Sequence, residues 1–341
     1  MNSVVAFGET LLRLKSPGAE RLLQTSNLEA TFGGAEMNVL AALSGWGTPT
    51  RFVTLLPEGP LGDAARREIA AHGIGGEHVM RTPGRLGIYF LEGGSGARAA
   101  RITYDRSNSA FTQVESGSVP WKIVLRGAGW LHLTGITAAL GEAPMRAAHV
   151  AAKLARECGI TVSLDVNYRA QLWAGASVRP VDALQPLLEC ASIVFAGAGD
   201  GPACFGRKSP AAGANTRAGF ERFAAQLLTA HANIQTVVGT LRQARAADAQ
   251  KVAAACRERR GGCRWSRVHL LGNIVDRIGS GDALAAGFIH GRLRRWPTAR
   301  TLEFAAAAAA LKHTIAGDVA RLTEEEVVAL VEGRDPGRVL R

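Results

Sequence analysis

The sequence predicts an α/β fold: a mostly parallel central sheet with helices on both faces, and a small separate β-sheet. Three observations support this class. Short apolar segments alternate with Ala-rich helical segments, the apolar segments end in Gly, Asn or Asp, and one long segment has the pattern of a hairpin. The chain has 341 residues, 47% of them hydrophobic, which is enough to bury a large core. One large domain with a small appendage fits this length, and so do two domains.

The elements of the central sheet follow one another in alternation. Strands are expected at residues 3–8, 50–56, 129–135, 161–167 and 191–197. Helices are expected at residues 35–47, 61–73, 143–159 and 220–232, and the first three of them stop at glycine. Ligands of such sheets bind beyond the carboxyl ends of the strands, so we expect the functional site there.

The hairpin pattern lies at residues 85–106, where two alternating strands flank a Gly-Gly-Ser-Gly turn. Together with residues 9–18, this hairpin could form a small sheet outside the main one. A lid over the site is one interpretation, because a group-transfer site must exclude water. A hairpin without a function is the alternative.

The charge of the chain raises the question of its partners. The formal net charge is +11 and the pI is 10.1, with basic residues densest at 256–267 and 291–296. Neither stretch belongs to a recognisable nucleic-acid-binding motif. We therefore expect a solvated basic surface and no nucleic acid partner. A positive field would also favour an anionic small-molecule substrate.

Cysteine usage and hydropathy address the compartment. The five cysteines are widely scattered and odd in number, so we expect reduced thiols and no zinc site. No uncharged apolar run approaches the roughly 18 residues of a membrane span, and the first residues lack the pattern of a signal peptide. These observations predict a cytoplasmic protein with no membrane partner.

Two common nucleotide-binding motifs do not fit the chain. Residues 201–209, "GPACFGRKS", approach a P-loop, but Arg207 separates Gly206 from Lys208, and Pro210 interrupts the helix that should follow. No G-x-G-x-x-G follows an expected strand. A P-loop and a Rossmann nucleotide site are therefore both disfavoured.

The most informative stretch is "DRIGSGD" at residues 276–282. Residues 268–275 just before the glycines have the pattern of a strand, and apolar residues at helical spacing follow them. This places Gly279 to Asp282 at a helix N-terminus. Free N–H groups there favour an anion, glycine lets the backbone approach a phosphate, and Asp282 could accept a hydroxyl proton. A plain loop–helix junction with an N-capping Asp would explain the same residues.

Several separated segments resemble one family. Residues 276–282 resemble the second signature of the ribokinase-like (PfkB) carbohydrate kinases, and residues 33–47 resemble the first, a Gly-Gly turn that opens a helix. Within that family the chain is most similar to the 2-keto-3-deoxygluconate kinases. This likeness is carried by residues 8–14, 85–94, 104–111, 130–137, 165–173, 276–282 and 310–318. It is weak over about 197–270.

The resemblance implies a fold and an assembly. It implies one ribokinase-like kinase domain over residues 1–341, with a β lid formed by about 9–18 and 85–106. It also implies that two or more copies of the chain can pair through this lid, as a homodimer or a higher homo-oligomer.

The same resemblance implies the site residues. The catalytic set is Asp282, Gly279, Ser280 and Gly281. The substrate-binding set is Gly34, Asn38, Tyr89, Tyr104, Arg106 and Arg169. The set for ATP is Asn167, Gly239, Thr240, Gly279 and Gly281. No protein side chain is expected to ligate the metal directly, because Mg²⁺ would bridge the ATP phosphates and keep most of its waters.

The implied activity is ATP-dependent phosphorylation of a hydroxyl of 2-keto-3-deoxygluconate. Asp282 would take the hydroxyl proton, while the N–H groups of residues 279–281 would stabilise the phosphate charge. Arg106, in "YDR" at 104–106, is expected to bind the carboxylate and so to favour a sugar acid over a neutral sugar.

Two departures from the family leave alternatives open. "GAGD" at 197–200 stands where the family commonly has Asn-x-x-Glu; Asp200 supplies an acid, but Gly197 supplies no amide. Residues 239–250 match the nucleotide-binding loop only at their start, and their Ala-rich composition predicts helix instead of the expected strands. The alternatives are a kinase for another sugar, such as fructose or ribose, and a catalytically weakened relative with a binding or regulatory role.

Overall fold

A computed structural model describes residues 3–115, 117–206 and 215–334. Within these residues the main sheet contains ten strands. Their bounds are β1 Ser3–Phe7, β4 Thr50–Pro57, β5 Gly75–Thr82, β8 Ala128–Thr134, β9 Thr161–Asp165, β10 Ile193–Phe195, β11 Thr236–Ala246, β12 Ala249–Glu258, β13 Cys263–Trp265 and β14 His269–Leu271. They are arranged in the order β13-β12-β11-β10-β9-β8-β1-β4-β5, and β14 pairs with β12.

The pairing of these strands defines one functional edge. From β5 to β11 every neighbouring pair is parallel, and the pairs made by β12 are antiparallel. The parallel strands therefore present their carboxyl ends at the same edge of the sheet. The central strands are buried on both faces and mostly apolar, as β1 shows with five fully or nearly fully buried residues.

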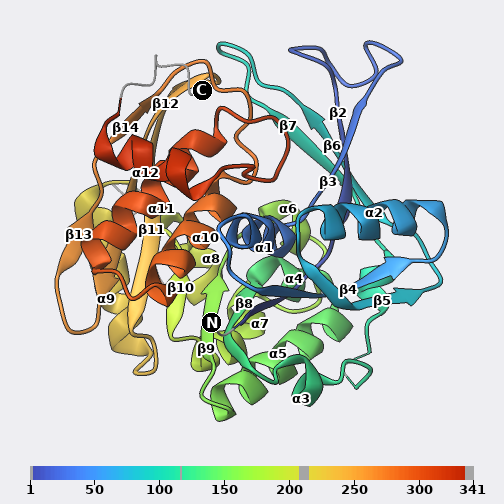
Figure 1. Cartoon of the computed structure of the whole chain (residues 1–341), viewed down its shortest axis with the longest axis horizontal. Helices are drawn as coiled ribbons and strands as arrows, with labels where there is room; N and C mark the ends of the chain where they lie inside the picture. Colours follow the sequence, from blue (N-terminus) through green and yellow to red (C-terminus); the bar gives the residue numbers. More distant parts are fainter. Residues whose placement is uncertain (1–2, 116, 207–214, 335–341) are drawn as a thin grey trace.

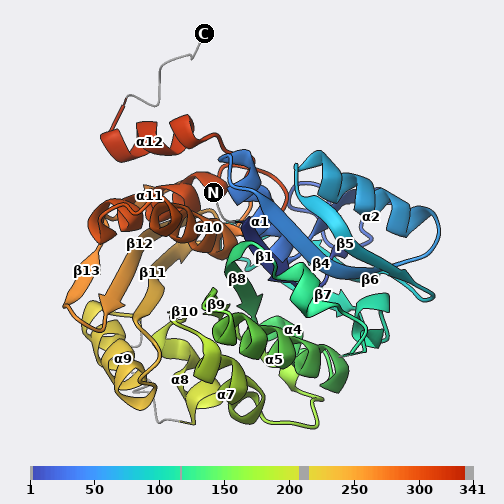
Figure 2. The ribbon, with the colours of Figure 1, turned by 60° about the horizontal axis from the view of Figure 1, so that its bottom comes forward.

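Helices cover both faces of this sheet (Figures 1 and 2). Their bounds are α1 Ala35–Gly45, α2 Pro60–Ala71, α3 Trp121–Val124, α4 Gly135–Ala139, α5 Glu142–Glu157, α6 Ala170–Trp173, α7 Pro180–Cys190, α8 Gly201–Phe205, α9 Arg217–Ala230, α10 Ser280–Leu293, α11 Thr298–Lys312 and α12 Glu324–Glu332. One core packs α5, α7 and α9 against one face, and a second packs α1, α10 and α11 against the other.

A small sheet stands apart from the main one (Figure 1). It consists of β2 Leu11–Lys15, β3 Glu29–Gly33, β6 Gly87–Glu92 and β7 Arg101–Asp105, in the order β3-β2-β6-β7. Strands β6 and β7 pair antiparallel, so the hairpin predicted at 85–106 is present, and β2 lies within the predicted 9–18. Strand β3 was not predicted from the sequence.

Two predictions about secondary structure are wrong. Residues 239–250, predicted as helix, are strand: β11 continues to Ala246 and pairs antiparallel with β12 from Ala249 onward. Alanine favours helices locally, but long-range pairing and burial of β12 in the core override that preference. Of the strand-like segment 268–275, only His269–Leu271 is strand, and the flanking Val268 and Val275 are exposed.

The remaining elements agree with the sequence prediction. Each expected strand and helix of the main sheet is found within two or three residues of its predicted bounds. In the P-loop-like stretch, residues 201–205 form α8, which ends at Gly206, and residues 207–209 lie outside the described residues. Along the described part of the chain, no helix has the length and apolar character needed to cross a membrane.

Candidate active site

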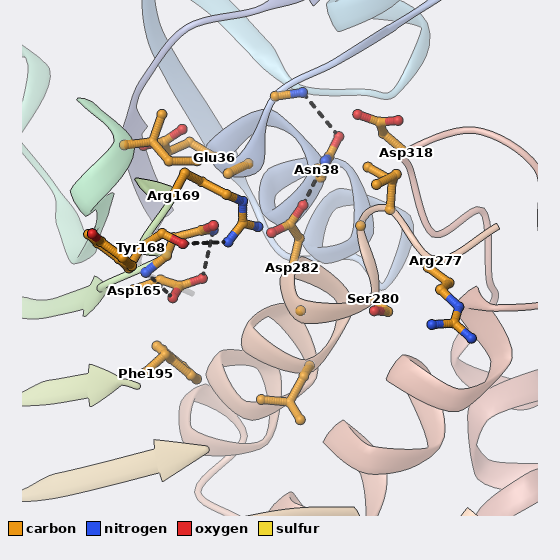
Figure 3. Close-up of a pocket in the computed structure, with 18 of the residues that line it drawn as sticks. Glu36, Asn38, Asp165, Tyr168, Arg169, Phe195, Arg277, Ser280, Asp282 and Asp318 are labelled. Atoms are coloured by element: carbon orange, nitrogen blue, oxygen red, sulfur yellow. Dashed lines mark hydrogen bonds between the residues drawn. The ribbon is translucent and has the colours of Figure 1, made fainter. Parts of the chain in front are cut away.

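A pocket of about 490 Å³ opens at the carboxyl ends of the parallel strands, between the small sheet and α10. It brings together every site residue predicted from the sequence: Gly34, Asn38, Tyr89, Tyr104, Arg106, Asn167, Arg169, Gly239, Thr240, Gly279, Ser280, Gly281 and Asp282. The lining residues come from segments more than 200 residues apart in the chain. Figure 3 shows this pocket in close-up.

Asp282 lies in the first turn of α10 and is 8% exposed. Its Oδ2 accepts a hydrogen bond from Nδ2 of Asn38, at 2.7 Å (Figure 3). Burial, with a smaller contribution from the neighbouring carboxylate of Asp165, raises the pKa of Asp282 to about 7, although the hydrogen bond from Asn38 opposes the shift. A carboxyl with a pKa near neutrality is suited to accept a proton at physiological pH. Asp282 is not the N-cap, because Gly279 occupies that position.

The turn before α10 is shaped by close backbone contacts. Gly279 has φ +82°, and a Cβ there would lie 1.8 Å from the carbonyl oxygen of Asp318, so a side chain is excluded. Asp276 braces the turn by accepting from the N–H of Ile278 (3.0 Å) and of Gly317 (3.2 Å). The N–H groups that begin this 14-residue helix therefore face the pocket with the positive end of the helix dipole.

Two further carboxylates line the pocket where β9 and β10 end. Asp165 accepts from the backbone and side-chain nitrogens of Asn167, both at 3.1 Å, and burial raises its pKa to about 7. Asp200 accepts from the N–H of Gly197 at 2.7 Å, and burial raises its pKa as well. The side-chain oxygen of Asn167 is buried and has no hydrogen-bond partner among the described residues. The arrangement offers two carboxylates and an unused acceptor to a hydrated cation.

The small-sheet wall is held by hydrogen bonds within the protein. Tyr89 and Tyr104 are cross-strand partners, with ring centroids 6.2 Å apart. The Tyr89 hydroxyl donates to Asp318 at 2.6 Å. Arg106 forms an ion pair with Glu9 through Nε and Nη2, and its guanidinium carbon lies 5.5 Å from the ring centre of Tyr104. The tyrosines thus pack across the hairpin and also line the pocket.

Three other arginines line the pocket, and their hydrogen bonds go to uncharged groups. Arg169 and Arg277 each donate to a backbone carbonyl, at 3.0 and 2.6 Å, and Arg242 donates to Oγ of Ser280 at 3.2 Å. Among the described residues, none of the three has an ion-pair partner. Figure 3 shows Arg169 extending toward Asp282 from the opposite wall. These three guanidinium groups are therefore near carboxylates of the pocket but are not directly paired with any described one.

Several residues of the site were not assigned from the sequence: Glu9, Glu36, Asp165, Arg242, Arg277 and Asp318. For Asp165 a signal existed, because it ends a predicted strand, where ligands of α/β sheets bind. Arg242 was not assigned because its segment was predicted as helix, whereas it lies on β11. Glu9, which pairs with Arg106, could be found only from the fold, since 97 positions separate them.

Comparison with known proteins identifies the family. The model of the pfkB family carbohydrate kinases matches residues 1–324. The chain belongs to this family. Its architecture is the ribokinase-like fold, and it is a carbohydrate kinase.

Three PfkB relatives are informative. A 2-dehydro-3-deoxygalactonokinase from Haloferax volcanii is 31% identical over 334 residues, with 98% of both chains covered. A 2-dehydro-3-deoxygluconokinase from Bacillus subtilis is 26% identical, with 95% of this chain and 94% of the relative covered. The crystal structure of a 2-dehydro-3-deoxygluconokinase from Thermotoga maritima superposes with a TM-score of 0.92 at 36% identity, covering 98% of this chain and 100% of that chain.

Proposed function

We propose that this carbohydrate kinase transfers a phosphoryl group from ATP to a hydroxyl of a 2-keto-3-deoxy sugar acid such as 2-keto-3-deoxygluconate. The observation that carries the proposal is the pairing of Asp282 with the helix N-terminus that begins at Gly279. A buried carboxyl with a pKa of about 7 can take a proton, and the adjacent N–H groups can hold a phosphate. The relatives named above act on sugar acids of this class.

The reaction assigns separate tasks to the residues of the site. Asp282 removes the proton from the attacking hydroxyl, and Asn38 orients its carboxylate through the 2.7 Å hydrogen bond. The N–H groups of residues 279–281 stabilise the charge on the transferring phosphate. The hydroxyl oxygen forms the new bond to phosphorus, the bond to the bridging oxygen of ATP breaks, and ADP leaves with that electron pair.

A magnesium ion bound with ATP fits the strand-end wall. Mg²⁺ keeps several waters and is commonly held by one or two carboxylates together with phosphates. Asp165 and Asp200 would hold its waters, and the unpartnered oxygen of Asn167 could accept from one of them. The ion would neutralise phosphate charge. Asp200 in this role would supply the acid that the family carries in its Asn-x-x-Glu segment.

Recognition of the sugar is assigned to the wall that faces Asp282. Gly34 lets the chain approach closely, because a Cβ there would lie 2.2 Å from the carbonyl oxygen of Glu9. The tyrosines offer flat apolar surfaces with polar tips to the hydroxyls. The sequence assigned the carboxylate of the substrate to Arg106, whose charge is already paired with Glu9. Arg169 has no ion-pair partner within the described residues, so we assign the carboxylate to Arg169 and the shaping of the wall to Arg106.

The nucleotide is expected to lie along β11, where Gly239 and Thr240 line the pocket. A Cβ at Gly239 would meet both the Phe220 ring and the Ala196 carbonyl, at 2.6 and 2.7 Å, so the strand lies close to its neighbours there. The extended β11–β12 pair supplies the strands that the sequence analysis found missing, which supports an active kinase over a weakened relative.

The small sheet is proposed to act as a lid and as a subunit interface. It supplies Tyr89, Tyr104 and Arg106 to the pocket, and its edge strand β3 has an exposed start. An exposed edge strand can pair with a second copy of the chain. Sedimentation of the purified protein tests the assembly. Hydrogen exchange through residues 85–106 should slow when saturating sugar acid is added, and unchanged exchange would contradict lid closure.

A coupled assay of ADP release tests the activity. The substrates are 2-keto-3-deoxygluconate, its galactonate epimer, fructose and ribose, each with ATP and Mg²⁺. We expect one of the acids to exceed both neutral sugars in kcat/KM by at least about tenfold, the effect of one charge-assisted hydrogen bond. A neutral sugar as the best substrate would contradict the acid assignment, and no acceptor-dependent turnover at all would favour a binding or regulatory protein.

A further inference from the structure

The side chain of Arg242 contacts the turn at the start of α10. It belongs to β11, and its Nη2 donates to Oγ of Ser280, the first residue of α10, at 3.2 Å. A Cβ at Gly281 would lie 3.9 Å from the same nitrogen. Strand β11 and helix α10 lie side by side in both general views (Figures 1 and 2). The guanidinium is therefore in contact with the turn that also carries Asp282.

The hydrogen-bonding capacity of this guanidinium is largely unused. Its Nε is buried and has no partner among the described residues, and no described carboxylate forms an ion pair with it. Arg169 and Arg277 lie near enough to repel it, whereas Asp282 and Asp165 attract it. Arginine does not lose its proton in proteins, so the group cannot escape this environment by becoming neutral. An anion in the pocket would give the buried donor a partner and the charge a direct counterion.

The two arginines that are buried among the described residues, Arg13 and Arg106, show that such a state is avoidable. Arg13 is 2% exposed and pairs with both Asp276 and Asp318, and Arg106 pairs with Glu9. Each is neutralised by a carboxylate of its own chain. Arg242 is held against the phosphate-binding turn with no such partner, which is the arrangement expected of a ligand contact.

We propose that Arg242 binds the phosphoryl group during transfer, from the nucleotide side and opposite the sugar hydroxyl. This inference rests on the proposed function only in that the pocket transfers a phosphoryl group to an acceptor. Free N–H groups of Arg242 donate to the oxygens of the γ-phosphate, while the backbone N–H groups of residues 279–281 hold the same group from the helix end. Arg242 forms and breaks no covalent bond. Its charge offsets the negative charge that spreads over the phosphoryl oxygens as the bond to ADP breaks.

The inference separates γ-phosphate recognition from general nucleotide binding. A residue that contacts the transferring group should contribute to binding of an ATP analogue and to kcat, and contribute little to binding of ADP. A residue that merely supports β11 should affect ATP analogue, ADP and protein stability together.

The test compares Arg242→Ala and Arg242→Lys with wild type and with Arg245→Ala. Arg245 is a matched control because it lies on the same strand and is exposed. We expect kcat of Arg242→Ala to fall by about 100-fold or more, as for removal of other transition-state donors, with the lysine variant in between. Calorimetry should show a loss of at least about tenfold in affinity for AMP-PNP and less than about threefold for ADP. Guanidinium ion added to Arg242→Ala should restore part of the lost turnover, and Arg245→Ala should match wild type.

Two results would overturn the proposal. One is a kcat of Arg242→Ala within about threefold of wild type; the other is an equal loss of affinity for AMP-PNP and ADP without rescue by guanidinium. Failure of the proposed substrate class is distinguishable from both. If the wild type phosphorylates fructose and ignores the sugar acids, the acid assignment fails, yet the comparison of variants still applies with fructose as acceptor. The binding measurements decide the matter even without a known acceptor.

Discussion

On the small-sheet wall of the pocket the arginines are neutralised by carboxylates of the protein, whereas on the strand-end wall they are not. Arg106 pairs with Glu9, and Arg13, just behind the wall, pairs with Asp276 and Asp318. Arg169, Arg242 and Arg277 have no such partners within the described residues. The same type of side chain thus serves two purposes within one pocket. A paired guanidinium fixes the shape of the wall, and an unpaired one is available to an anionic ligand.

Under the proposed function, this difference also suggests where each of the two substrates binds. The arginines without partners surround Asp282 and the carboxylates at the ends of β9 and β10, where phosphates and metal are expected. The small-sheet wall presents the rings of Tyr89 and Tyr104, which suit sugar hydroxyls. In the proposed reaction, the groups that bind charge therefore lie on one side of the transferred proton, and the groups that fit the sugar hydroxyls lie on the other.

The largest expected effect comes from Asp282→Asn. An amide keeps the shape and the contact with Asn38 but cannot take the proton, so kcat should fall by about 100- to 10,000-fold while sugar binding persists. Steady-state kinetics and calorimetry with the sugar measure the two quantities. A near wild-type kcat in this variant would show that Asp282 is not the general base.

The same variant should be more stable than wild type above neutral pH. The raised pKa means that protonated Asp282 favours the folded state below its ordinary pKa of 3.8, and this contribution is lost as the pH rises through about 7. The asparagine carries no charge at any pH, so Tm should rise by about 2–4 °C at pH 8 and change less at pH 5. Thermal unfolding at both pH values checks the difference.

Next in size is the contrast between Arg169→Ala and Arg106→Ala. Losing an unpaired guanidinium that binds the carboxylate should reduce kcat/KM by about 10- to 100-fold for the acid and barely for fructose. Losing Arg106 should reduce kcat/KM equally for both substrates. It should also lower the stability of the protein, since a buried Glu9 left unpaired costs about 3–5 kcal/mol. A Glu9→Gln, Arg106→Gln double variant should regain part of that stability. A loss of kcat/KM in Arg106→Ala that is confined to the acid would show that Arg106 binds the substrate carboxylate, as the sequence predicted.

The pH profile is expected to show a smaller and more gradual effect. With a pKa of about 7 on Asp282, kcat/KM should fall by about tenfold per pH unit well below neutrality. Asp165 also has a pKa of about 7, so Asp165→Asn serves as the control. The acidic limb should remain in Asp165→Asn and be absent from the residual activity of Asp282→Asn. The opposite assignment would make Asp165 the titrating group.

The smallest effect is expected at an exposed ion pair. Arg85 holds Asp105 on the hairpin through two 2.7 Å hydrogen bonds and lowers its pKa, but water surrounds both groups. Asp105→Asn should leave Tm within about 2 °C and activity within about twofold of wild type. A loss of Tm and activity as large as that of Arg106→Ala would show that an arginine on this wall stabilises the protein through its ion pair, whether or not the pair is buried.

The sequence predicted much of this structure because its signals are local. Strand and helix periodicity located the main sheet, and all thirteen assigned site residues line one pocket. Their placement rests on short motifs such as residues 276–282, where the glycines and Asp282 are close in the chain. The role of each one remains a prediction for the variants above to test.

What the sequence missed depends on contacts between distant segments. The alanines of residues 239–250 favour helix by themselves, and only the pairing of β11 with β12 makes them strand. Because of that error, the sequence did not indicate that Arg242 lines the pocket. In the same way, nothing near Arg106 in the chain indicates that Glu9 neutralises it, so its availability to a substrate could not be judged before the fold was known.

Asp318 connects the two walls, and this has a consequence for the protein when no sugar is present. Its carboxylate accepts from Tyr89 and Arg13 of the small sheet, and its carbonyl oxygen packs against Gly279 at the phosphate-binding turn. Any outward movement of the small sheet would withdraw both donors from Asp318 and loosen the turn that it supports. Water would then meet a poorly formed phosphate cradle. If the small sheet closes over the sugar as proposed, hydrolysis of ATP without an acceptor should therefore be slow, because the catalytic site is complete only when the sugar is bound.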